Sequence, residues 1–291
     1  MEFSWDLLRP MMLVPYLPTL GPLHPDTVSG ALLGQVLAVA GTGAFLPHDK
    51  DQRWSAVKDE SVLPKEVDQD AERTLIPTVS TRGRGTVKVH LYGNSATHRA
   101  EAAERALTLA ATHGAAKAQV IWFLAAGSPV PPGTGATRVQ LRTFIPNTLA
   151  PDPGRVLNLD DQPDATHATF AEFADKLSGD GFAFLWEQVQ RGTVGPVLTI
   201  ASAGRIVGAI GPMETMADPG DRLRLLPQYF AVLPDQRGHG HGRALWRAAM
   251  HWGQRHGAEY QLLQTEVGGA SDRLCQAEGL TDLGTVHSVP A

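Results

Sequence analysis

An apolar segment, a run of alternating glycines and an amphipathic helix follow one another near residue 240, and this succession constrains the fold more than any other part of the chain. The segment LLPQYFAVLP from Leu225 predicts a strand, and RALWRAAMHWGQRHG from Arg243 predicts a helix that stops at Gly257. Glycines stand between them at positions 238, 240 and 242. The first N–H groups of a helix lack partners, and the helix dipole adds partial positive charge there. Because glycines let the backbone approach a diphosphate closely, the turn is predicted to bind phosphate.

The side chains around this turn are consistent with an anion site. Arg237 and Arg243 stand on either side of the glycines and carry guanidinium donors suited to phosphate oxygens. His239 and His241 alternate with the glycines and are interpreted as residues that flank the phosphate, not as metal ligands. The spacing does not match the GxGxxG dinucleotide fingerprint, and the GK[ST] of a P-loop is absent from the turn.

The rest of the second half predicts alternating helices and strands. Its expected elements are a strand in RVQLRTFI from Arg138, helical turns in TFAEFADKL and FAFLWEQVQ on either side of Gly179–Gly181, a hairpin in VLTIASAGRIVGAIGPM from Val197 with its turn at Ser202–Gly204, a strand in YQLLQTEV, a helix in ASDRLCQAEG and a last strand in LGTVHSV. This order predicts a mixed α/β domain.

The first half contains a strand, helix, strand unit of its own. TVKVHLYG from Thr86 and AQVIWFLAA from Ala118 have strand character, and the segment from Ser95 to Gly114 predicts the helix between them. Upstream, ALLGQVLAVAG from Ala31 is compatible with a short buried helix, and the highly charged stretch 49–72 is expected to be a solvated loop or surface helix.

Proline and glycine crowd the segment GSPVPPGTGA at 127–136, where neither helix nor strand can persist. We therefore predict an N-terminal α/β domain over 1–130 and a second domain over 137–291. The length of 291 residues and the 43% hydrophobic content are sufficient for two cores.

Composition excludes several classes of function. The net charge is -5 without long runs of like charge, which disfavours nucleic acid as the main ligand. Cys275 is the only cysteine, so neither an intrachain disulfide nor a cysteine-based zinc site is possible. Three prolines and early acids in the first 21 residues do not fit a signal peptide, and the sequence contains no apolar run of about 18 residues. We expect a soluble cytoplasmic protein with no membrane segment; the composition leaves the oligomeric state open.

The glycine turn resembles the signature of the GNAT superfamily of acyl-coenzyme-A-dependent N-acyltransferases. That signature, R/Q-x-x-G-x-G/A between a strand and a helix, is matched by Arg237, Gly240 and Gly242. A second family segment, N-x-x-A-x-x-L-Y-x-x-x-G-F, aligns without gaps with GGASDRLCQAEGL from Gly268 to Leu280. The resemblance covers about residues 137–291 and implies a GNAT-like acyltransferase domain.

The resemblance implies acetyl-coenzyme A as co-substrate and a small-molecule amine as acceptor. It implies that backbone groups of Phe230, Ala231 and Val232 pair with the pantetheine arm, and that the pyrophosphate lies on the turn formed by Arg237, Gly238, His239, Gly240, His241, Gly242 and Arg243. The strand, turn, helix, strand order of the first half is interpreted as a degenerate second copy, as in tandem GNAT proteins. An unrelated α/β domain is the alternative.

Two positions depart from the family pattern. The family's tyrosine, which protonates the leaving thiolate, is replaced by Cys275, and its asparagine by Gly268. Tyr229 could substitute as the proton donor or could simply line the pocket. Glu214, after the hairpin, and Glu266, at the end of the later strand, are the candidate bases.

Two other functions stay open. One is a GNAT-fold transferase that uses aminoacyl-tRNA, which would need a basic surface. The other is a non-catalytic acyl-coenzyme A sensor, which the missing tyrosine favours.

Overall fold

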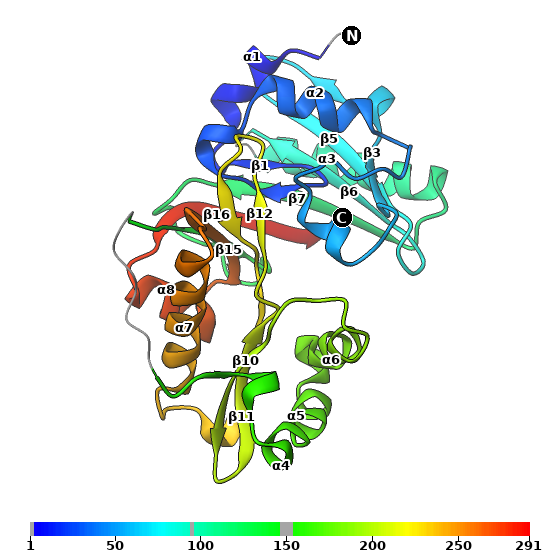
Figure 1. Ribbon diagram of the computed structural model, residues 1–291. Helices are drawn as coiled ribbons and strands as arrows, with labels where there is room; N and C mark the ends of the chain where they lie inside the picture. The colour runs from blue at the N-terminus through cyan, green and yellow to red at the C-terminus, as the bar shows by residue number, and fades with distance from the viewer. Residues whose placement is uncertain (1–2, 94–95, 146–153) are drawn as a thin grey trace. The chain divides into compact units, whose positions relative to one another are not determined.

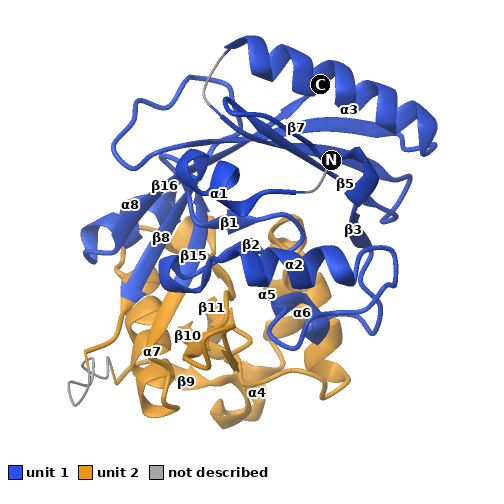
Figure 2. Ribbon diagram, turned by 90° about the horizontal axis from the view of Figure 1, so that it is seen from above, with its two compact units in different colours: residues 1–142, 262–291 blue, residues 143–261 orange. Residues whose placement is uncertain are grey.

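The computed structural model describes residues 3–93, 96–145 and 154–291 (Figure 1). Two compact units divide the chain: residues 1–142 together with 262–291, and residues 143–261 (Figure 2). Among the described residues, no helix combines the length and the apolar composition needed to cross a membrane.

The first unit is built on a mixed sheet. Its strands run in the order β15 (Tyr260–Glu266), β8 (Thr137–Thr143), β16 (Thr281–Pro290), β7 (Lys117–Leu124), β6 (Thr86–Tyr92), β5 (Thr74–Ser80) and β3 (Glu60–Val62), with β4 (Asp68–Gln69) also beside β5. Helix α3 (Ala96–Thr112) connects β6 to β7, which confirms the predicted strand, helix, strand order, and the two strands are parallel neighbours. Its alanines and Leu109 pack on Val87, Val89 and Val120 to form one core of this unit.

The opposite face of this sheet carries the N-terminal segment. Short elements follow one another here: α1 (Trp5–Leu8), β1 (Tyr16–Leu17), β2 (Gly21–Pro22) and α2 (Gly30–Ala38). Helix α2 confirms the short buried helix expected from Ala31. The Tyr92 hydroxyl donates to the Tyr16 carbonyl (2.8 Å), and the Tyr16 ring lies 5.2 Å from that of Phe123, so the segment adds a second layer of core.

One sequence expectation for this unit needs correction, and one strand was missed. The charged stretch 49–72 is not simply a solvated loop or surface helix, because it contributes β3 and β4 and contains a buried carboxylate, Asp49. Lys58 pairs with Asp49 and compensates its charge, which is why a charged segment can lie inside. Strand β5 was not predicted, since Pro77 stands in its middle and cannot donate to a strand ladder.

The last strand of the chain belongs to the sheet of the first unit. β16 lies between β7 and β8 and is antiparallel to both, with Val286 paired to Phe123 on one side and Thr137 on the other. Residues 262–291 therefore group with the first half of the chain. The predicted domains, 1–130 and 137–291, are divisions of the sequence and differ from these contact-based units; they stay a prediction.

The second unit has a four-stranded sheet in the order β14 (Tyr229–Val232), β11 (Arg205–Gly211), β10 (Leu198–Ser202) and β9 (Leu157–Asn158). The β10–β11 hairpin confirms the predicted turn at Ser202–Gly204. Helices α4 (Asp164–His167), α5 (Phe170–Lys176), α6 (Phe182–Gln190) and α7 (His241–Arg255) complete the unit, and α8 (Ala270–Ala277) lies in the first. The rings of Phe170, Phe173 and Phe182 are fully buried between the α5 and α6 turns.

The second unit also has a longer antiparallel pair, in which β11 and β12 (Thr215–Ala217) on one strand face β13 (Leu223–Leu225) and β14 on the other, and this pair is interrupted near its middle. β12 pairs antiparallel with β13, and its register continues that of β11 with β14. The predicted single strand from Leu225 is therefore two strands, β13 and β14, separated at 226–228. Pro212 and Pro227 lie in the two facing interruptions and have no N–H to donate to the ladder, which explains the break.

Candidate functional site

The glycine turn has the backbone conformation that the alternating glycines predict. Gly238 and Gly240 have φ of +84° and +76°, in the region that other residues rarely adopt. Gly240 is the N-cap of α7, and its carbonyl accepts the Ala244 N–H (3.1 Å). The N–H groups of His241, Gly242 and Arg243 precede this bond and have no partner within the helix.

Gly242 serves a different purpose from the other two glycines. It lies in the first turn of α7, and a Cβ built there would be 3.5 Å from Cζ of Phe230 on β14. A side chain longer than one carbon at this position would therefore meet the Phe230 ring. The absence of a side chain lets the start of α7 lie close to the Phe230 ring on β14.

Three basic side chains of the second unit belong to this turn. Arg237 Nε donates to the Val232 carbonyl (3.3 Å), and Arg243 is exposed in the first turn of α7. Arg155 Nη2 donates to the Gly240 carbonyl (3.1 Å). Arg155 was missed by sequence reasoning, because it precedes the turn by 85 residues and no local pattern marks it.

The two histidines of the turn lie beside each other. Their rings are stacked with centroids 5.9 Å apart, and His239 Nδ1 is 3.3 Å from the Gln236 carbonyl. Partial burial, Arg155 and His239 together lower the pKa of His241. Within the described residues, no group of three His, Cys, Asp or Glu side chains is arranged to hold a metal ion.

Strand β14 is the edge of its sheet, and its register determines which residues face outward. Leu233 N–H donates to the Val207 carbonyl (2.9 Å), so 207 and 233 form a hydrogen-bonded pair. Because such pairs alternate along antiparallel strands, Tyr229 and Ala231 bond to β11, whereas Phe230 and Val232 direct their backbone groups outward. Among the described strands, none pairs with that outer edge.

The interruption at 226–228 separates β13, which has a parallel neighbour, from β14, which has an antiparallel one. Before it, β13 runs parallel to the start of β15, with Leu225 opposite Gln261. After it, β14 pairs antiparallel with β11. Gln261 Nε2 donates to Gln228 Oε1 (2.8 Å) at the point where this change occurs.

Glu214 lies in the same interruption, on the facing strand. Its carbonyl accepts the Leu226 N–H (2.9 Å), and its Oε1 accepts the Gly195 N–H (3.1 Å). The side chain is half-buried. Gly195 is required here, since a Cβ at that position would lie 2.3 Å from the Met213 carbonyl oxygen.

Tyr229 starts β14 and packs against the beginning of α6. Its ring is 6.2 Å from Phe182 and 6.4 Å from Phe184. Gly181, with φ +85°, accommodates it, because a Cβ there would lie 2.4 Å from Tyr229 Cε1. These contacts fit a pocket-wall aromatic better than a freely placed proton donor.

The other sequence candidates belong to the first unit. Glu266 is exposed at the end of β15. Cys275 is 2% exposed on α8, and burial, assisted by Asp272 and Glu278, raises its pKa to about 11, so it remains a neutral thiol. The Gly268 N–H donates to the buried Asp272 carboxylate (2.8 Å), which closes the turn before α8.

Residues 162–274 match the acetyltransferase (GNAT) family, and this part of the chain belongs to it. The family supports acyl transfer as the general class of reaction. Solved structures similar to the chain include a GCN5-related N-acetyltransferase from Sphaerobacter thermophilus (15% identity, 78% of this chain and 82% of that chain, TM-score 0.47) and a GNAT-family acetyltransferase from Colwellia psychrerythraea (11%, 90% and 97%, 0.48). A tandem GNAT protein from the clavulanic acid biosynthesis pathway is also similar (13%, 92% and 96%, 0.43). No curated protein sequence matches the chain.

Proposed function

We propose that the chain is an N-acetyltransferase that moves an acetyl group from acetyl-coenzyme A to the amine of a small molecule. The observation that carries the proposal is the continuity between the outer edge of β14 and the glycine turn at the start of α7. An arm with amide groups can pair with an unpaired strand edge, and a diphosphate can bind helix N–H groups. Coenzyme A contains both parts in that order.

The residues that would hold coenzyme A form two groups. Phe230 and Val232, with Ala231 between them, offer a strand edge to the pantetheine amides. The turn offers backbone N–H groups and positive charge to the pyrophosphate, through Arg237, Gly238, His239, Gly240, His241, Gly242 and Arg243, with Arg155 beside Gly240. When bound, the thioester supplies an activated acetyl group. The protein then acts by positioning the amine and by directing N–H groups near Val232 at the acyl carbonyl.

We assign the base that removes the amine proton to Glu214, acting directly or through water. Glu214 lies in the same unit as the glycine turn, in the hairpin interruption three residues beyond Gly211, whose register partner is Tyr229. The Gly195 N–H donates to Oε1 of Glu214, which holds the carboxylate in place. Glu266 is exposed in the other unit, so it is the weaker candidate.

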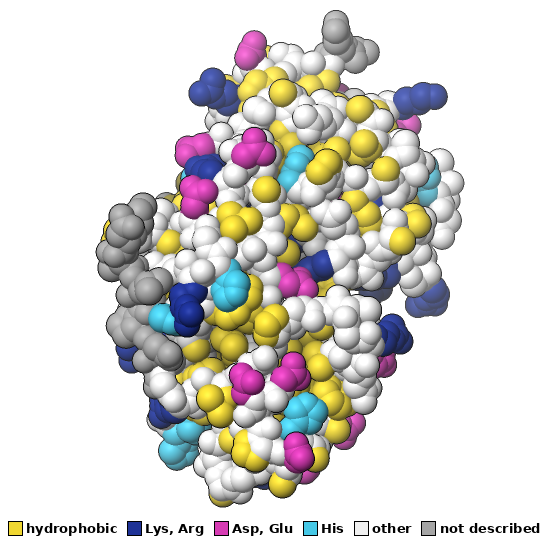
Figure 3. All heavy atoms as spheres, viewed as in Figure 1, with side chains coloured by type: hydrophobic (Ala, Val, Ile, Leu, Met, Phe, Trp, Pro, Cys, Tyr) yellow, Lys and Arg dark blue, Asp and Glu magenta, His cyan; other side chains and the backbone are white. Residues whose placement is uncertain are grey.

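The acceptor is proposed to be a small metabolite-like amine, and the location cytoplasmic. A tRNA substrate would need a broad basic surface. On the face shown in Figure 3, the described acidic and basic side chains are interspersed, which does not favour that alternative. A non-catalytic sensor stays as the second candidate, favoured by Cys275 in place of the family tyrosine.

Calorimetric titration with acetyl-coenzyme A tests the proposal. The wild-type protein should bind with a micromolar Kd, and Gly240→Asp should weaken binding at least about tenfold, because it strains the turn and adds a negative charge at the phosphate. Gly114→Asp is the matched control, since Gly114 has φ +64° and open space around it but lies far from the turn in sequence. Absence of binding by the wild-type protein would exclude the coenzyme A assignment.

Thiol release in the presence of a panel of small amines then separates the two candidates. An acetyltransferase releases free coenzyme A only when an amine acceptor is present. Tight binding without release for any amine would favour the sensor.

A further inference from the structure

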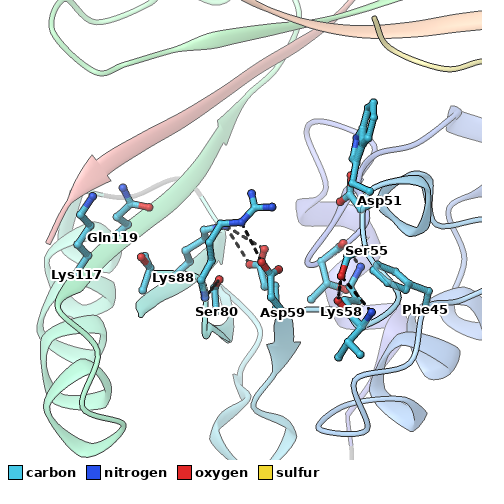
Figure 4. Close-up of a pocket in the computed structure, with 15 residues that line it drawn as sticks. Phe45, Asp51, Ser55, Lys58, Asp59, Ser80, Lys88, Lys117 and Gln119 are labelled. Atoms are coloured by element: carbon cyan, nitrogen blue, oxygen red, sulfur yellow. Dashed lines mark hydrogen bonds and ion pairs between the residues drawn. The ribbon is translucent and has the colours of Figure 1, made fainter. Parts of the chain in front are cut away.

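The first unit contains a cavity of about 470 Å³ that is separate from the glycine turn (Figure 4). One side is formed by β3, β5, β6 and β7, and the other by the segment from Phe45 to Lys58. A volume of this size falls in the range of small-molecule sites. All of the lining residues belong to the first unit.

Four side chains of the sheet make a compact patch of hydrogen-bond donors in this cavity. Thr86 is the register partner of Lys117, and Lys88 that of Gln119, on the parallel strands β6 and β7. Side chains alternate along a strand, so these four share the face opposite to Val87 and Val89, which pack on α3. Figure 4 shows Lys117 and Gln119 on one side of the cavity and Phe45 and Asp51 on the other.

Three of these four side chains have no polar partner in the part of the chain that the structure describes. Within residues 3–93, 96–145 and 154–291, the Thr86 hydroxyl, the Lys117 ammonium and the Gln119 amide have neither a hydrogen-bond nor an ion-pair partner. They are adjacent and of three donor types: a hydroxyl, a cation and an amide. Such a group is suited to the oxygens of one small anion.

Among the described charged residues that line the cavity, one cation, the exposed Lys117, has no ion-pair partner. The other charged side chains of the wall are each paired within the unit, as Lys88 with Glu60 (3.1 Å), Arg82 with Asp59 (3.1 Å), Asp51 with Lys50 (3.0 Å) and Lys58 with the buried Asp49. Lys117 is the remaining one, and it can neutralise one negative charge. The wall facing it includes the apolar side chains of Phe45, Trp54 and Val57.

We propose that this cavity binds a small organic monocarboxylate whose apolar part faces Phe45 and Trp54. Lys117 pairs with the carboxylate, and Thr86 and Gln119 donate hydrogen bonds to it. Thr86 and Lys117 are the first residues of β6 and β7, whereas β6 leads into α3 from its other end, at Tyr92. The cavity is therefore at the opposite end of this strand, turn, helix unit from the position of a GNAT phosphate turn, and it does not depend on the proposed acetyltransferase function.

Saturation-transfer NMR and calorimetry on the full chain test this site, with benzoate, 3-phenylpropionate and octanoate as probes. At least one should bind with a Kd below about 1 mM, a free energy of about -4 kcal/mol. The uncharged amide of the same probe should bind at least about tenfold more weakly, because it cannot pair with Lys117. Lys117→Gln should weaken carboxylate binding by about the same factor.

One control and one further variant keep the test specific. Lys65→Gln removes an exposed lysine of the same unit outside the cavity and should leave binding unchanged. Trp54→Ala should weaken binding of the carboxylate while preserving its preference over the amide. The proposal is overturned if no probe binds, if Lys117→Gln has no effect, or if inorganic phosphate binds Lys117 more tightly than every carboxylate.

Discussion

At the scale of single residues, the proposal of Glu214 as the base has the most direct consequence for catalysis. One of its carboxylate oxygens is held by the Gly195 N–H, and the backbone around it is fixed by the bond to Leu226. Replacement of Glu214 by glutamine would remove the ability to accept a proton and would keep nearly the same side-chain shape.

We expect Glu214→Gln to lower kcat for acetyl transfer by about 100-fold, in the range of general-base contributions. The Kd for acetyl-coenzyme A should change less than about twofold, since Glu214 is not part of the turn. Steady-state kinetics with the best amine acceptor measure the first quantity, and calorimetry the second. Glu266→Gln is the control and should keep full activity; a large loss there instead would move the base to Glu266.

Arg155 and His241 offer a second residue-scale prediction. Arg155 contributes to the low pKa of His241, after burial, because two positive charges near each other disfavour protonation. Removal of the guanidinium in Arg155→Ala should therefore raise the pKa of His241. An NMR titration of the His241 ring protons measures this shift directly, and an unchanged or lower pKa would contradict the contact between Arg155 and the turn.

At the scale of elements, close approaches at two glycines set the conformation around the interruption between β11 and β12 and at the start of β14. Gly181 admits the Tyr229 ring at the start of α6, and Gly195 lets the segment before β10 approach the Met213 carbonyl. Neither glycine can gain a side chain without movement of the elements that it touches. The position of β14 and of Glu214 therefore depends on contacts with residues more than fifteen positions away in sequence.

Gly195→Ala should destabilise the fold by about 1 to 3 kcal/mol, the usual cost of overpacking. Gly34→Ala is the opposite case, because Gly34 is inside α2 and an added methyl group would have nothing within 4 Å, so this change should stabilise the protein by up to about 1 kcal/mol. Urea unfolding of both variants measures the two changes. Equal effects would show that the close approach at Gly195 has no energetic consequence.

At the scale of the whole molecule, buried histidines of the first unit predict sensitivity to acid. Burial lowers the pKa of His90 to about 4, and the same cause, with Arg99, lowers the pKa of His287 to about 4. His90 is held by the Ile76 carbonyl (3.1 Å), and His287 is stacked on Trp122 between two threonine hydroxyls. Both rings are accommodated as neutral groups.

The free energy of unfolding should fall as the pH is lowered from about 6.5 to 4. In this window the unfolded chain takes up protons on these histidines and the folded chain does not, so protonation favours unfolding. For His90 the loss amounts to roughly 3 kcal/mol at pH 4. The stability difference between wild type and His90→Gln, measured by urea unfolding across this pH range, isolates this contribution from that of the carboxylates; a pH-independent difference would contradict it.

Sequence alone determined the features that depend on neighbouring residues. Hydrophobic periodicity and chain-breaking residues predicted the mixed α/β class, the strand, helix, strand unit of the first half and the hairpin with its turn at Ser202–Gly204, and all of them are confirmed. The family resemblance was found from the spacing of the glycines around position 240. This spacing is readable in the sequence because the turn has positive φ at Gly238 and Gly240, which only glycine adopts readily.

Tertiary structure decided what depends on residues far apart in the chain. The outward orientation of Phe230 and Val232 follows from their register with β11, and the role of Arg155 follows from a contact across 85 positions. The place of β16 between β7 and β8 joins the end of the chain to its first half. Local periodicity does not predict which strands pair, because any strand of suitable polarity fits a given position in a sheet. The partner is determined by packing in the complete core.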